Sequence, residues 1–133
     1  MRSRSLWAAL VLSIVLLGAS TPAWVHHSGA MFDSMKEVTV TGTVKEFQYS
    51  NPQSWLLVDV TGKDGKVTTW GFEAEGPSTL TRAGIRPSDF RPGTKIEIVG
   101  RPMRDGRPAA SWVRATRLSD GKVFNPAAGF AVK

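Results

Sequence analysis

Residues 36–75 read KEVTVTGTVKEFQYSNPQSWLLVDVTGKDGKVTTWGFEAE, and this stretch decides the fold. Its first part, over residues 36–49, alternates between two faces. One face carries valine or glycine and the other threonine or lysine: Val38, Val40, Gly42 and Val44 against Thr39, Thr41, Thr43 and Lys45. Alternation with a period of two in β-branched residues predicts a β-strand. Gly42 interrupts the apolar face, which indicates a sharp coil of the strand or the close approach of another backbone.

Two further strands are predicted in the rest of this stretch. Pro52 cannot donate to a strand ladder, so it marks a break after the first strand. The second strand is predicted over residues 54–60 and the third over residues 66–75. Asp64-Gly65 supplies the tight turn between them, because both residue types tolerate positive φ.

A short helix and two more strands follow. Pro77 suits the first turn of a helix and Gly84 a left-handed end, so a helix is predicted over residues 77–83. Alternating isoleucines predict a fourth strand over residues 94–100. A fifth strand is predicted over residues 110–118, and the turn that follows would return a short hairpin through Val123 and Phe124.

Three strands, a helix and two strands is the order of an OB-fold, a five-stranded partly open barrel. We therefore predict a mainly β chain with one short helix between strands three and four, preceded by a helical signal peptide. Leu80 is the residue expected to plug one open end of the barrel. An open β-sandwich would give a similar pattern.

The N-terminus predicts export. Arg2 and Arg4 precede an apolar run over residues 6–17, and small residues follow up to Ala23. This order is typical of a secretory signal peptide cleaved after Ala23. Twelve helical residues span about 18 Å against a hydrocarbon core of roughly 30 Å, so a permanent membrane anchor is the weaker alternative. We expect a periplasmic or secreted protein with four parts: a signal peptide (1–23), an N-terminal extended segment (24–35), an OB-like barrel (36–124) and a C-terminal tail (125–133).

Composition narrows the function classes. The chain has 133 residues, 17 Lys and Arg, 11 Asp and Glu and no cysteine. The length suits one domain, and the missing cysteines exclude disulfides, thiolate zinc sites and cysteine nucleophiles. Positive charge gathers after residue 80, where it would face an acidic partner or an anionic membrane surface, or simply solvent. Export argues against nucleic acid as the routine ligand.

Several short motifs, in this order, carry a family resemblance. They include His26-His27-Ser28, Phe32-Asp33, VTGTV at 40–44, Ser50-Asn51-Pro52, Trp55, Asp64-Gly65-Lys66, Trp70 with Phe72-Glu73, Arg91-Pro92-Gly93 and Val99-Gly100. The chain resembles small exported bacterial proteins of uncharacterised function that begin, after the signal peptide, with His-His-Ser. Gln53 stands where these proteins more often have histidine, which argues against a metal ligand in that loop. The resemblance implies an exported OB-like domain and no known activity.

His26 and His27 are the candidate metal ligands. Cleavage after Ala23 would leave Trp24-Val25-His26 at the new terminus. A free amine, two amides and a third-position imidazole suit the square-planar preference of Cu(II) or Ni(II). The alternative is a mobile or hydrogen-bonded histidine pair at a chain end.

Four residues are candidates for ligand binding on the barrel face: Trp55, Trp70, Trp112 and Arg114. Aromatic rings on an open barrel can stack a planar ligand, and arginine recognises carboxylate or phosphate. The alternatives are core filling for the tryptophans and a charged strand edge for Arg114, with its neighbours Arg101, Arg104, Arg107 and Arg117.

Glu73 and Glu75 share a strand face about 7 Å apart, a spacing open to acid-base work, but a solvated strand edge is the expected reading. No convincing catalytic constellation accompanies them. We therefore expect a non-enzymatic binding module of the bacterial cell envelope, with a small anionic ligand or an envelope protein as partner. Copper or nickel binding at the mature terminus is the alternative.

Overall fold

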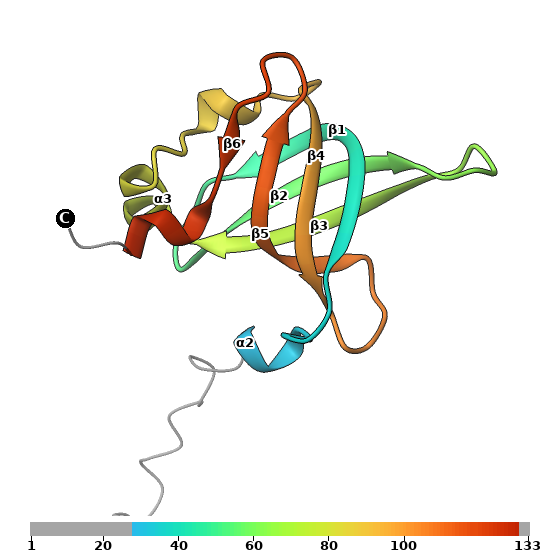
Figure 1. Cartoon of the computed structure of the whole chain (residues 1–133), viewed down its shortest axis with the longest axis horizontal. Helices are drawn as coiled ribbons and strands as arrows, with labels where there is room; N and C mark the ends of the chain where they lie inside the picture. Colours follow the sequence, from blue (N-terminus) through green and yellow to red (C-terminus); the bar gives the residue numbers. More distant parts are fainter. Residues whose placement is uncertain (1–27, 131–133) are drawn as a thin grey trace, which may run out of the picture.

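The computed structural model describes residues 28–130 (Figure 1). The predicted signal peptide lies outside them. In chain order the elements are α2 (Ser28–Met31), β1 (Val38–Gln48), β2 (Gln53–Thr61), β3 (Val67–Glu75), α3 (Pro77–Arg82), η1 (Pro87–Phe90), β4 (Lys95–Pro102), β5 (Ala109–Arg117), β6 (Val123–Phe124) and η2 (Pro126–Phe130), where η marks a 3₁₀-helix. The predicted strands and the helix differ from the observed ones by at most two residues at either end.

The strands close into a barrel. They form one sheet in the order β3-β2-β1-β4-β5-β6, and a parallel pairing of β3 with β5 joins the two sides. Five strands thus enclose the core, with β6 as an extra strand beside β5. The predicted OB-fold-like barrel, with a short helix between strands three and four, is confirmed. An open sandwich is excluded because closure pairs the strand edges that a sandwich would leave free.

Gly42 lies where β1 changes neighbours. Strand β1 pairs with β4 from Val38 to Thr43 and with β2 from Thr43 onward. A Cβ atom at Gly42 would overlap the carbonyl oxygen of Asp59 and lie 2.8 Å from Cγ1 of Val58. The predicted close backbone approach is therefore confirmed, and it lets one long strand wrap two sides of a small barrel.

The barrel interior is apolar and rich in aromatic rings. Leu80 of α3 is fully buried in it, as expected for a plug at one barrel end. Phe90 of η1 is also fully buried and packs edge-on against three rings, with centroid separations of 5.6 Å to Phe47, 5.2 Å to Trp112 and 4.8 Å to Phe124. Trp112 therefore helps to fill the core, and the turn before β4 contributes a central core residue.

The two ends of the described chain form short helices rather than extended segments. The prediction of an extended segment over residues 24–35 is wrong for Ser28–Met31, which form α2. Arg104 explains the turn, because its backbone N–H donates to Met31 O at 2.9 Å and its Nε to Ala30 O at 3.3 Å. Within the expected tail, Pro126–Phe130 form η2 and pack on α3, with Arg82 Nε donating to Gly129 O at 3.1 Å.

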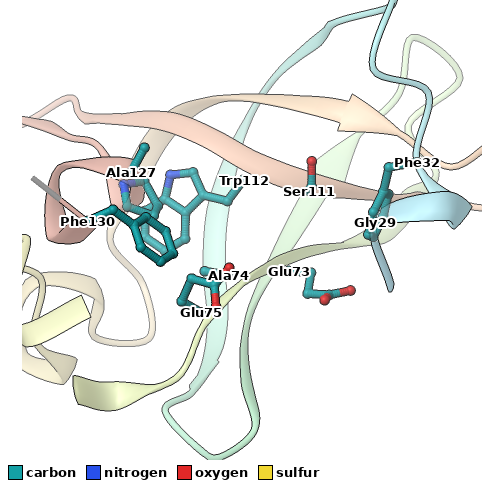
Figure 2. Close-up of a pocket in the computed structure, with 10 residues that line it drawn as sticks. Gly29, Phe32, Glu73, Ala74, Glu75, Ser111, Trp112, Ala127 and Phe130 are labelled. Atoms are coloured by element: carbon teal, nitrogen blue, oxygen red, sulfur yellow. The ribbon is translucent and has the colours of Figure 1, made fainter. Parts of the chain in front are cut away.

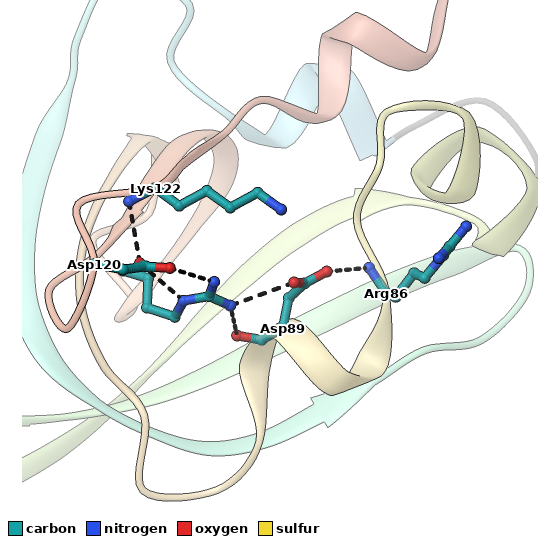
Figure 3. Close-up of polar contacts among 5 residues, drawn as sticks. Arg86, Asp89, Asp120 and Lys122 are labelled. Carbon is teal, nitrogen blue, oxygen red and sulfur yellow. Dashed lines mark hydrogen bonds and ion pairs between the residues drawn. The ribbon is translucent and has the colours of Figure 1, made fainter.

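Arg117 of β5 ties η1 to the turn between β5 and β6 through Asp89 and Asp120, whose contacts are drawn as dashed lines in Figure 3. Arg117 Nε and Nη2 donate to the two carboxylate oxygens of Asp120, at 3.0 and 2.6 Å. Its Nη1 donates to Oδ1 and to the carbonyl oxygen of Asp89, each at 3.3 Å. The Asp89 carboxylate in turn accepts from the backbone N–H of Arg86 at 2.9 Å. Arg117 is therefore part of a structural clasp rather than a free anion-binding group.

The clasp predicts that the Asp120 carboxyl stabilises the folded protein less as the pH falls. The hydrogen bond from Arg117, supported by the backbone N–H of Lys122, lowers the pKa of Asp120 to about 2. Because this folded pKa lies below the unfolded value of roughly 3.9, the stabilisation is fully present above the unfolded pKa and is lost as pH falls towards 2. Carboxyl NMR titration should show Arg117→Met raising the pKa of Asp120, while Arg107→Met leaves it unchanged. An unshifted Asp120 in the Arg117 variant would contradict the clasp.

Candidate functional site

A cavity opens between α2, β3, β5 and η2 (Figure 2). Its volume is about 260 Å³. The lining combines residues from four parts of the chain: Gly29, Phe32, Glu73, Ala74, Glu75, Ser111, Trp112, Pro126, Ala127 and Phe130. Closure of the barrel creates this site, because the β3–β5 pairing sets Glu73 directly beside Ser111.

Glu73 is covered although it lies on the outer face of the barrel. Only 9% of its surface is exposed, whereas Glu75 is exposed. Phe32, itself 5% exposed, lines the same cavity from the segment that follows α2 (Figure 2). The interpretation of a solvated strand edge is therefore wrong for Glu73 and correct for Glu75. Strand periodicity alone cannot report this difference between two glutamates on one face of β3.

Trp112 places a buried hydrogen-bond donor at the site. Its side chain is 6% exposed, and its Nε1 has no hydrogen-bond partner among residues 28–130. In Figure 2 the nitrogen-bearing edge of the indole faces the wall formed by Ala127. A buried donor without an acceptor costs about 1–3 kcal/mol. The atom itself is almost fully covered, so an acceptor on a molecule in the cavity would remove that cost only once the covering part of the lining shifts.

The charge of the lining is opposite to that of the whole chain. The formal net charge of the protein is +6. The described residues that line the cavity include two carboxylates, Glu73 and Glu75, and no lysine or arginine. The cavity is therefore suited to positively charged or hydrogen-bond-donating groups on its carboxylate side.

The structure separates the other predicted ligand-binding residues from this cavity. Trp55 is half-buried on the outer barrel face, where it pairs across the sheet with Glu73. Trp70 packs against the core with its ring stacked on Phe72 at 6.1 Å. Among these three tryptophans, Trp112 alone belongs to the described lining.

A β-bulge separates Arg114 from Trp112. Gly100 pairs with Trp112 and Val99 with Arg114, so Val113 is the extra residue. Residues two apart on a regular strand share a face, but an extra residue reverses the alternation. Trp112 is consequently buried while Arg114 is exposed, and the two do not form the joint aromatic and basic surface that the sequence suggests.

A second cavity is lined by basic side chains. It has a volume of about 480 Å³, and its lining includes Arg91, Lys95 and Arg117 beside Asp89. Arg117 is occupied by the clasp, which leaves Arg91 and Lys95 as the exposed basic groups. This is where the described residues offer the basic surroundings that a small anion needs.

The candidate metal ligands His26 and His27 lie outside the described residues. Within residues 28–130, no three His, Cys, Asp or Glu side chains gather into a group able to hold a metal ion. Over the same residues, no helix has the length and apolar content to cross a membrane.

Sequence reasoning missed the parts of the site contributed by the two ends of the chain. Phe32 directly follows α2, and Phe130 is the last residue of η2. Both helices are too short to show a periodic hydrophobic pattern in the sequence. The signals available were Asn125-Pro126, which suits the start of a helix, and an aromatic residue four positions later. These cues do not indicate where on the barrel a helix will pack.

Comparison with known proteins places the chain among relatives without an assigned activity. A model of a family of unknown function matches residues 13–111, well over half of the chain. No curated protein matches it.

Proposed function

The chain belongs to the family of unknown function DUF6152, and we propose that it is an exported, non-enzymatic binding module of the bacterial cell envelope. Its ligand is a small molecule taken up in the cavity between α2, β3, β5 and η2. Export is supported by the charged, apolar and small-residue order of residues 1–23. Nucleic acid is not the expected partner of an exported protein.

The buried Nε1 of Trp112 carries this proposal. Folded proteins pair nearly all of their buried polar groups, so an orphan donor calls for an explanation. Here the donor belongs to a residue that lines a cavity, beside carboxylates and aromatic rings. A ligand that accepts a hydrogen bond from Trp112 Nε1 would explain why this donor has no partner among the described residues.

Binding fits the lining better than catalysis does. Ser111 is the one hydroxyl side chain among the described lining residues. Among the described residues, Ser111 makes no side-chain hydrogen bond to a base that would activate it. A serine nucleophile requires such a base within hydrogen-bond reach.

Filling the cavity should abolish binding. We expect Ala127→Phe to occupy the space next to Trp112, whereas Ala128→Phe, an equally exposed neighbour that does not line the cavity, serves as the control. The probes are choline, 3,3-dimethylbutan-1-ol, acetate and glucose, each added separately. The readout is the indole N–H resonance of Trp112, together with the amide resonances of Ser111 and Ala127. Wild type and the control should respond to at least one probe and the filled variant to none; silence of wild type towards all four would reject the proposal.

Copper or nickel binding at the mature terminus is the second candidate function. It is supported by the third-position histidine that cleavage after Ala23 would create, with His27 next to it. Mass spectrometry of the exported protein tests the start at Trp24. If the start is correct, His26→Ala should lose Cu(II) binding in a titration, and an unchanged affinity would reject the site.

The expected small anionic ligand has its own candidate place. The second cavity, with Arg91 and Lys95 exposed in its lining, supports this version of the binding function. Acetate separates the two possibilities in the same experiment. Shifts confined to Lys95 and Ser119 would assign anion binding there, whereas shifts at Trp112 would assign it to the first cavity.

A further inference from the structure

The size of the first cavity restricts the ligand. Pockets for drug-sized molecules occupy roughly 300–1,000 Å³, and this cavity measures about 260 Å³. A peptide side chain, a small amine or a small alcohol would fit, whereas an oligosaccharide would not. The ligand therefore belongs to the smallest class of metabolites.

The carboxylates favour a cation. Glu73 and Glu75 are two apart on β3, and both line the cavity. Glu75 is exposed at its mouth, while Glu73 has a contact of its own and contributes its negative charge from within the covered part. In the described lining no lysine or arginine offsets these charges. The burial of Glu73 strengthens its attraction for a positive group, because the surrounding protein screens charge less than water does.

Aromatic rings favour the same kind of ligand. Phe32, Trp112 and Phe130 line the cavity from three different segments (Figure 2). Phe130 is 60% exposed, so a ligand in the cavity can cover part of its apolar surface. A cation over the face of tryptophan or phenylalanine gains about 0.5–2 kcal/mol, and quaternary ammonium groups are the ligands that such rings recognise best.

The Trp112 N–H adds a second requirement. Indole nitrogen is a donor only, so its partner must supply an acceptor oxygen or nitrogen. A bare ammonium ion would satisfy the carboxylates and the rings but would leave this donor unpaired. The ligand must therefore carry both groups within one small molecule.

On the basis of the proposed binding function, we infer that the cavity takes a small organic cation that also bears a hydrogen-bond acceptor, such as a quaternary amino alcohol. The positive group lies between Glu75 and the aromatic rings, and the acceptor receives the hydrogen bond of Trp112 Nε1. Glu75 and Trp112 are the two residues that determine specificity.

Matched probes test the charge. Choline and 3,3-dimethylbutan-1-ol have the same shape and hydroxyl group and differ in the positive charge. We expect choline to bind the full-length protein about tenfold more tightly by titration calorimetry, because the carboxylates attract only the charged probe and the rings favour a cation over a neutral group of the same shape. Glu75→Gln should remove most of this difference. Glu46→Gln, an exposed carboxylate of β1 outside the described lining, should keep it.

A second pair of probes tests the acceptor. Tetramethylammonium has the charge of choline and lacks its hydroxyl group. Wild type should prefer choline, with a downfield shift of the Trp112 indole proton, and Trp112→Phe should bind both cations alike. Because Trp112 also packs in the core, the Glu75 variant provides the independent test if the Trp112 variant does not fold.

Different outcomes would reject the assigned class of ligand and the proposed binding function. Equal or tighter binding of the neutral alcohol would overturn the assignment of a cation and leave the binding function standing. Equal affinities of wild type for choline and tetramethylammonium would overturn the role of Trp112 as donor to the ligand. Failure of all probes to bind wild type would reject the proposed function itself.

Discussion

Phe90→Ala is expected to lower the free energy of unfolding by about 3–5 kcal/mol, the usual cost of removing a large ring from a filled core. Phe90 is fully buried and lies at the centre of the aromatic cluster formed with Phe47, Trp112 and Phe124. Removing its ring leaves a cavity beside Trp112, so the loss should also loosen one wall of the binding site. Urea unfolding followed by tryptophan fluorescence measures the effect.

Two further variants serve as controls for Phe90→Ala. Phe90→Leu keeps much of the volume and should cost clearly less than alanine. Val67→Ala removes apolar surface at a position that is 60% exposed and should change stability by less than about 0.5 kcal/mol. A Phe90→Ala protein as stable as the Val67 variant would show that η1 does not contribute the core residue described here.

Gly42→Val is expected to cost at least about 2 kcal/mol, because a side chain there must push apart strands that the barrel holds together. Its Cβ atom would overlap the carbonyl oxygen of Asp59, a backbone group without a rotamer to escape. The strain falls where β1 leaves β4 for β2, so both pairings should weaken. Thermal unfolding measures the loss, and amide exchange in β1 locates it.

Gly29→Ala is the matched control. A Cβ atom at Gly29 meets nothing within 4 Å, so this substitution should leave the unfolding temperature unchanged or raise it slightly. Equal unfolding temperatures for wild type and Gly42→Val would mean that the barrel can open at this point without cost.

Local pattern predicted the elements well because their causes are local. Alternation in residues 36–75 reports which side chains a strand presents to each face, and the buried Leu56, Val58 and Phe72 bear this out. Gly84 supplies the left-handed residue after α3, with φ of 75°, because only the backbone of that residue is involved. The order of strands around the helix predicts the barrel, and the β3–β5 pairing distinguishes it from an open sandwich.

The candidate site was only partly predictable. Trp112 is one of the four predicted ligand-binding residues and lines the cavity. Glu73 and Glu75 also line it, although the sequence favours a solvated strand edge for both. The predicted surface shared by Trp112 and Arg114 does not form, because the bulge at Val113 turns the arginine to the other face of the strand. A bulge depends on how two strands fit together, and the alternation of one strand carries no trace of it.

By itself the sequence determined where strands, turns and the short helix form, since each follows from residues within one or two turns of chain. Only the tertiary structure decided which segments of the chain contact one another. The pairing of β3 with β5 brings Glu73 next to Ser111, and the packing of α2 and η2 sets Phe32 and Phe130 around them. These contacts join segments far apart in the chain, and their free energy comes from burying surface that no local pattern specifies.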